Sequence, residues 1–149
     1  MNTENLRIVV ADHDEVNRIF FRNIFKEAKV PVSSLEFDSG RSMMEYFNTI
    51  SKAIPGILFM NHNLPGKESA AYLNKIKSDP EFSRLIVVIY SSGLTEEQIE
   101  DMFIRGGNIF MRLPDNYQEL KKLLLEVVNS SWQYHASALS IETFIMRVE

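Results

Sequence analysis

The segment GILFMNHNLPG, residues 56–66, joins an apolar run to a polar turn. Residues 56–61 show no alternation of polar and apolar side chains, which is typical of a strand buried on both faces of a parallel sheet. The Pro-Gly pair that follows marks a turn. We therefore expect a buried strand that ends at Asn61 and presents polar side chains at one edge of a sheet.

Comparable runs occur at four other places in the chain. They are LRIVVA at 6–11, SLEFD at 34–38, LIVVIYS at 85–91 and NIFMRL at 108–113. Apolar residues recur between them at helical spacing: Val16, Phe20, Ile24 and Ala28; Met43, Phe47 and Ile50; and Tyr117, Leu120, Leu124, Val127 and Val128. Strands that alternate with helices in this way predict an α/β fold, with a five-stranded parallel sheet and helices on both faces.

The composition excludes several classes of protein. A chain of 149 residues that is 45% hydrophobic can bury one core of ordinary size. The net charge of −4, with no basic block, argues against a nucleic-acid partner. The chain has no cysteine, which removes disulfides and thiolate chemistry. Neither a signal peptide nor an apolar run of about 18 residues is present, so we expect a cytoplasmic protein without a membrane partner.

The end of the chain does not fit the repeating pattern. We expect one domain over residues 1–130 and a C-terminal extension over 131–149. In this extension Ile141, Phe144, Ile145 and Val148 have helical spacing after Ser140, a candidate N-cap. This pattern predicts a short amphipathic helix, with an extra strand or a tail as the alternatives.

Polar residues follow the strands that should lie side by side. The carboxyl ends of parallel strands share one edge of the sheet, and doubly wound sheets bind ligands there. The residues at these ends are Asp12, His13 and Asp14; Asn61, His62 and Asn63; Ser91 and Ser92; and Arg112, Leu113 and Pro114. The candidate site is therefore at this edge.

Four segments at these strand ends, VVADHDEVNR, LFMNHNLPG, VIYSSG and IFMRLP, occur in an order that resembles a known family. Over about residues 5–130 the chain resembles the receiver domain of two-component response regulators. The resemblance implies a flavodoxin-like three-layer sandwich and a role in phosphorelay signalling, as a non-enzymatic module. It also implies a signalling partner such as a histidine kinase or an output protein.

The resemblance assigns roles to individual positions. In receivers an aspartate after the third strand takes the phosphoryl group from a phosphohistidine, and Mg²⁺ is held by that aspartate, an acidic pair and a backbone carbonyl. A hydroxyl and a lysine grip the phosphoryl oxygens, and an aromatic residue acts as a switch. In this order of roles, the matching positions are Asn61 for the phosphoacceptor, Asp12 and His13 for the acidic pair, Asn63 for the carbonyl, Ser91 for the hydroxyl, Leu113 for the lysine and Phe110 for the aromatic switch.

Three of these positions depart from the family's chemistry. Asn61 carries an amide, which is a poor nucleophile and brings no charge to a metal. His13 replaces an acid and Leu113 replaces the cation, although phosphoryl transfer needs charges at both places. We therefore interpret the chain as a pseudo-receiver with no catalytic residue and no expected cofactor. Weak Mg²⁺ binding at Asp12 stays open.

Several alternatives also stay open. Arg112 could replace the missing lysine, and Asp14 could replace the missing acid. Asp12, His13 and His62 could hold a transition metal, or the two histidines could sense pH. The chain could be a working phosphoacceptor with an atypical Mg²⁺ and phosphate site. It could also be a small metal- or nucleotide-binding α/β protein, although its first turn lacks the glycines of a phosphate loop.

The resemblance also implies a docking surface. In receivers the fourth helix, fifth strand and fifth helix form the face that responds to the switch residues, here Ser91 and Phe110. We expect binding to partners through this face without phosphorylation. A homodimer through the same face or through the C-terminal extension is an open alternative.

Overall fold

The computed structural model describes residues 5–49, 54–65, 69–136 and 144–149. Its strands are β1 (Leu6–Ala11), β2 (Val32–Phe37), β3 (Ile57–Asn61), β4 (Ile86–Ser91), β5 (Ile109–Arg112) and β6 (Met146–Val148). Its helices are α1 (Glu15–Phe25), α2 (Gly40–Thr49), α3 (Ser69–Lys77), α4 (Glu96–Ile104) and α5 (Tyr117–Ala136), with a short 3₁₀ turn at Pro80–Phe82. The strands pair in parallel in the order β2-β1-β3-β4-β5-β6.

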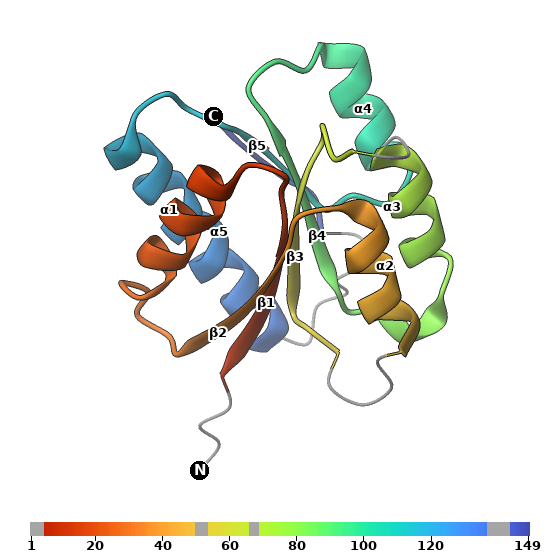
Figure 1. Ribbon diagram of the computed structural model, residues 1–149, viewed down its shortest axis with the longest axis horizontal. Coiled ribbons are helices and arrows are strands. Elements are labelled where there is room, and N and C mark those ends of the chain that lie inside the picture. The colour runs from red at the N-terminus through yellow and green to blue at the C-terminus, as the bar shows by residue number, and fades with distance from the viewer. Residues whose placement is uncertain (1–4, 50–53, 66–68, 137–143) are drawn as a thin grey trace.

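The sheet separates two hydrophobic cores (Figure 1). Helices α1 and α5 cover one face, and α2, α3 and α4 cover the other. Because successive strand residues point to opposite faces, Phe59 packs against α1 while its neighbours Leu58 and Met60 join the other core. The central strands are therefore apolar at nearly every position, and the predicted α/β fold is confirmed.

The edge strand β2 differs from its prediction. It spans Val32–Phe37 instead of 34–38, and its residues alternate between partly buried and exposed. Leu35 is 50% exposed on this strand, which lies at the edge of the sheet and pairs with β1 on one side. The predicted apolar stripe of α1 is also partly wrong. Its buried residues are Phe21, Ile24 and Phe25, and Val16 is exposed.

The C-terminal helix predicted from the spacing of Phe144, Ile145 and Val148 is wrong over Met146–Val148. These residues form β6, which adds a sixth strand beside β5 in the register Ile109↔Met146 to Met111↔Val148. Ser140 and Ile141 lie outside the described residues. Pairing with an open sheet edge satisfies the backbone polar groups of this segment, which three residues of isolated helix cannot do.

Helix α5 runs past residue 130, where we expected the domain to end, and continues to Ala136. Ser131, just beyond the expected boundary, is completely buried. In the described part of the chain no helix is both long and apolar enough to cross a membrane.

Side-chain caps begin the helices α1, α4 and α5, which lie near the candidate site. Asp14 accepts a hydrogen bond from the backbone N–H of Val16 at 2.8 Å and so begins α1 directly after the end of β1. Thr95 and Gln98 form a capping box at α4. The side chain of Asn116 accepts from the backbone N–H of Glu119 at the start of α5. Asparagine is one of the preferred N-cap residues. These caps place α1, α4 and α5 close to the strand ends that carry the candidate site.

Candidate functional site

The carboxylate of Asp12 lies at the end of β1 and is 1% exposed. Its Oδ2 atom accepts hydrogen bonds from the Tyr90 hydroxyl at 2.6 Å and from the Asn61 side-chain amide at 3.2 Å. Oδ2 also accepts from the Asn17 side-chain amide at 3.0 Å, and Oδ1 accepts from the backbone N–H of Asp14 at 2.8 Å. A carboxylate offers about four lone-pair positions. Three of the four donors share Oδ2 and one reaches Oδ1, so protein donors reach both carboxylate oxygens of Asp12.

The Tyr90 side chain lies in the core beneath α1 and α5, and its hydroxyl contacts Asp12. It is completely buried on β4, and its ring packs against Phe21 with centroids 5.0 Å apart. Burial raises the pKa of the Tyr90 hydroxyl well above its ordinary value, and the charge of Asp12 and the hydrogen bond to it act in the same direction. The phenol therefore stays protonated at neutral pH and donates to the carboxylate.

Asn61 ends β3 and uses both ends of its amide. Its Nδ2 donates to Asp12, and its Oδ1 accepts from the backbone N–H of Asn63 at 2.8 Å, which closes a local turn. An aspartate in this conformation could still accept from the N–H of Asn63, but it could not donate to Asp12, since an ionised carboxylate only accepts. It would also place a second negative charge beside Asp12. Asparagine thus suits a site that has no cation between the two side chains.

The two histidines at this edge do not form a metal site with Asp12. His13 is exposed, and its backbone carbonyl accepts from the Arg18 guanidinium at 3.4 Å. His62 donates its backbone N–H to the carbonyl of Tyr90 at 2.9 Å, and its Nδ1 atom is buried without a hydrogen-bond partner. Within the described ranges, no three histidine, aspartate or glutamate side chains lie close enough to hold a metal ion. The transition-metal hypothesis is therefore wrong for the described residues.

The two proposed substitutes for missing charges have other contacts. The Asp14 side chain caps α1. The Arg112 guanidinium pairs with Glu149 at 3.1 Å and lies 5.5 Å from the ring centroid of Phe110. It therefore faces the α4 side of the sheet. Leu113, one residue later, packs against the core formed with α1 and α5.

The other predicted site residues lie on β4, on β5 and in the loop after β3. Ser91 is buried at the end of β4, and its Oγ accepts from the N–H of Gly93 at 3.3 Å. Phe110 is completely buried in the core beneath α2, α3 and α4. Asn63 is exposed in the loop after β3. Asp12, Asn61 and Ser91 thus share one edge of the sheet.

Sequence reasoning missed three residues of the site: Tyr90, Asn17 and Arg18. The Arg18 guanidinium donates to the carbonyl of Asp12 at 2.7 Å. Asn17 and Arg18 are five and six residues after Asp12, so a capped helix starting at Glu15 places them one turn from the strand end. For Tyr90 the signal was a phenol in a strand that is otherwise aliphatic up to the site residue Ser91.

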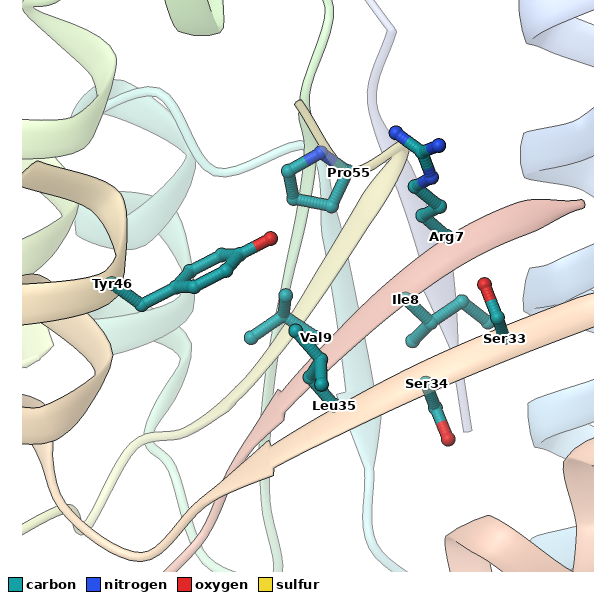
Figure 2. A pocket seen from close by; sticks show the side chains of 8 residues that line it. All are labelled: Arg7, Ile8, Val9, Ser33, Ser34, Leu35, Tyr46 and Pro55. Atoms are coloured by element: carbon teal, nitrogen blue, oxygen red, sulfur yellow. The ribbon is translucent and has the colours of Figure 1, made fainter. Parts of the chain in front are cut away.

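A pocket of about 260 Å³ lies at the other end of the sheet, near the amino ends of β1 and β3 (Figure 2). Val9 and Leu35 line it from the sheet, Tyr46 points into it from α2, and Arg7 and Pro55 lie at its rim. Burial raises the pKa of the Tyr46 hydroxyl, and the nearby Arg7 charge opposes this rise. None of its lining residues belongs to the predicted site.

No family model and no curated protein matches the sequence. Solved structures do match. The phosphorylated cyanobacterial phytochrome response regulator RcpA superimposes with a TM-score of 0.79 at 20% identity, over 90% of this chain and 98% of RcpA. The fold is that of a response-regulator receiver domain.

Two further receivers support this assignment of the fold. The Mn²⁺-bound form of the response regulator Rcp1 matches with a TM-score of 0.73 at 18% identity, over 89% of this chain and 97% of Rcp1. The chemotaxis response regulator CheY4 of Vibrio cholerae matches with a TM-score of 0.70 at 12% identity, over 86% of this chain and 99% of CheY4. At these identities the likeness establishes the receiver fold alone.

The resemblance to receivers implies a Mg²⁺ site at this edge of the sheet. Mg²⁺ requires oxygen ligands with free lone pairs, usually from one or two carboxylates. Of the three positions that the resemblance matches to acids, Asp12 alone carries a carboxylate, and its Oδ2 atom already accepts from Tyr90, Asn61 and Asn17. The residues of this chain therefore do not fit the Mg²⁺ site of a receiver.

Proposed function

We infer that this chain is a receiver-like signalling domain of a two-component system that does not accept a phosphoryl group at the usual position and acts by protein–protein interaction. One observation carries the inference: the buried carboxylate of Asp12 accepts hydrogen bonds from four protein donors, one of which is the amide of Asn61. The phosphoacceptor position therefore serves as a hydrogen-bond donor inside a closed network.

The chemistry of phosphoryl transfer supports the same conclusion. Transfer requires an anionic nucleophile in line with the leaving group and cations on the equatorial oxygens. Asn61 supplies no anion, and Leu113 supplies no cation and packs against the core. Arg112 does not compensate, because its guanidinium pairs with Glu149 on the opposite face of the sheet.

The network also explains how the strand ends stay together without a metal. Hydrogen bonds to Asp12 join β1 to β3 through Asn61, to β4 through Tyr90 and to α1 through Asn17. Phosphorylation cannot act on a site without an acceptor, so a partner that binds one conformation better than another is the available means of regulation. The partner class that fits this role is a signalling protein such as a histidine kinase or an output protein.

The experiment is incubation of the protein with Mg²⁺ and acetyl phosphate, followed by intact mass measurement. We expect no increase of about 80 Da, the mass of one phosphoryl group. A receiver with an intact phosphoacceptor aspartate, treated alongside, controls for the reagent. A stable adduct would instead support a working phosphoacceptor with an atypical site.

A Mg²⁺ titration followed by NMR tests the site directly. The side-chain amide signals of Asn17 and Asn61 should not move at millimolar Mg²⁺, because both groups donate to Asp12. The Asn61→Asp variant is the matched comparison, since its second carboxylate creates a pair that attracts a cation. Shifts of equal size in the two proteins would contradict the proposal.

A further inference from the structure

The C-terminal strand β6 lies on the edge of β5, at the centre of the face that receivers are expected to use for docking (Figure 1). We propose that this edge is a peptide-binding groove, that β6 is the chain's own displaceable ligand in it, and that a partner binds by inserting an extended segment of the same chemistry. The inference rests on the proposed role in protein–protein docking. It adds the site of docking, the chemistry of the partner and the element that competes with it.

The groove offers backbone partners to an extended segment. The N–H of Met146 donates to the carbonyl of Asn108 at 2.8 Å, and β6 then pairs in parallel with β5 through Val148. The side chain of Asn108 is buried and fixes the register. It accepts from the N–H of Val87 at 2.8 Å and donates to the carbonyl of Phe144 at 3.1 Å. Addition of a strand to an open edge is a common mode of peptide recognition.

The side chains of β6 show which residues the groove accepts. Val148 is 4% exposed and enters the core formed with α5, and Met146 packs against the same core. Arg147 points to the other face, where its guanidinium makes two bonds of 2.8 Å to Glu96 at the start of α4. Glu149 pairs with Arg112 at 3.1 Å. The fitting segment therefore reads apolar, arginine, apolar, acid.

The charges of the groove are complementary to this order. Hydrogen bonds from Arg147 hold the pKa of both Glu96 and Glu149 below the ordinary value, with a smaller contribution from Arg112. Without β6, the carboxylate of Glu96 on α4 would lose its Arg147 partner, and the guanidinium of Arg112 on β5 would lose its Glu149 partner. A partner segment that carries arginine and then an acid two positions later satisfies both groups.

The contacts that hold β6 are few enough for a partner to compete with it. The strand has three residues, and Val148 is the one side chain of residues 144–149 that is fully buried. The side chain of Glu96 is 71% exposed and that of Arg147 is 33% exposed, so solvent and salt weaken their attraction. Phe144 adds a stacked contact with Tyr134, with centroids 4.1 Å apart. Edge elements held by so few buried contacts open at low cost.

The experiment titrates a fluorescent peptide with the sequence of residues 144–149, FIMRVE, into the full-length chain and its Arg147→Glu variant. The variant places two acids together and opens β6, while Glu96, Arg112 and β5 are unchanged. We expect the peptide to bind the variant at least about tenfold more tightly than the wild type, because the groove is then free for a larger fraction of the time. A peptide with glutamate in place of its arginine is the matched control and should not bind.

Charge exchange provides the second measurement. The double variant Glu96→Arg with Arg147→Glu restores an ion pair of reversed sign between α4 and β6, so it should recover part of the amide protection of β6 that Arg147→Glu loses in hydrogen exchange; recovery is partial because the wild-type pair of Arg147 with Glu149 is not restored. The Arg147→Gln variant, which adds no repulsion, replaces Arg147→Glu if the latter does not fold.

Equal affinity of the peptide for wild type and variant, or equal binding of the control peptide, would overturn the proposal. A stable dimer of the opened variant that takes up no peptide would also overturn it, in favour of a second copy as the occupant. A phosphoryl adduct in the mass experiment would contradict the proposed function and leave the peptide result unaffected, so the two can fail separately.

Discussion

At the level of single residues, the candidate site is a set of hydrogen-bond donors around one buried carboxylate, that of Asp12. An ionised carboxylate out of contact with water is costly unless hydrogen bonds replace the lost hydration. Asp12 obtains these bonds from Tyr90, Asn61, Asn17 and the backbone of Asp14. Asn61 therefore has two effects. It removes the nucleophile, and its amide helps to stabilise the buried charge of Asp12 without a metal.

Removal of the phenol tests this network. The Tyr90→Phe variant keeps the buried ring but withdraws the 2.6 Å bond to Asp12. We expect the free energy of unfolding in urea to fall by about 1–3 kcal/mol, since a buried charged acceptor loses a donor. Tyr46→Phe is the control, because Tyr46 is a partly exposed tyrosine at the surface pocket (Figure 2). The free energy of unfolding of Tyr46→Phe should differ from that of the wild type by no more than about 0.5 kcal/mol. Equal effects of the two variants would contradict the role of Tyr90.

At the scale of elements, β6 shows how an open sheet edge overrides a local pattern. The spacing of Phe144, Ile145 and Val148 matched one face of a helix, yet the segment pairs with β5. In that extended form Val148 still reaches a core, and Ile145 is 61% exposed. Asn108 connects this strand to the rest of the sheet, since its side chain bonds to both Val87 and Phe144.

The Asn108→Ala variant should loosen β6 selectively. It leaves the N–H of Val87 and the carbonyl of Phe144 without their partner, which costs on the order of 1–3 kcal/mol for a buried group. We expect faster amide exchange at Met146 and Val87 than in the wild type, with smaller changes in β1 and β3. Asn23→Ala, on the exposed surface of α1, is the control and should leave exchange in β6 unchanged. Uniform acceleration across the whole sheet would contradict a local role.

At the level of the whole molecule, a long-range contact joins the end of α5 to the start of β3, at the end of the sheet opposite the candidate site. His135, in the last turn of α5, lies 3.0 Å through its Nε2 atom from the carbonyl of Gly56, just before β3. Burial lowers the pKa of His135 below 6.5, the nearby charge of Arg84 acts in the same direction, and the bond to Gly56 opposes them. Folding therefore favours the neutral ring, whose Nε2–H can donate to the carbonyl.

This contact predicts a pH dependence of stability. The pKa of His135 is lower in the folded than in the unfolded state, so the unfolded chain binds more protons between the two values. The contribution of His135 to the stability of the folded state is fully present above pH 6.5 and is lost as the pH falls from 6.5 through the folded pKa. Urea unfolding at several pH values should show this loss, and His135→Gln should flatten it. An NMR titration of the His135 ring with a pKa above 6.5 would contradict the prediction.

The parts of the site that could be predicted are those that a strand end determines. Asp12, Asn61 and Ser91 each follow a recognisable apolar run, and parallel pairing brings such ends to one edge of the sheet. The contact between Tyr90 and Asp12 joins residues 78 positions apart and depends on which face of β4 the phenol occupies. The pairing of Arg147 with Glu96, 51 positions apart, depends on where the chain returns after α5.

Local sequence patterns were enough to predict the order of the first five strands with their helices and the ends of those strands, because each depends on residues that are close together in the chain. Only the folded molecule shows how the charge of Asp12 is satisfied and where residues 144–149 lie. Both depend on side chains from distant segments that meet only when the sheet has formed. For β6 the deciding factor is the free edge of β5, whose unpaired backbone groups and Glu96 are available only in the folded molecule.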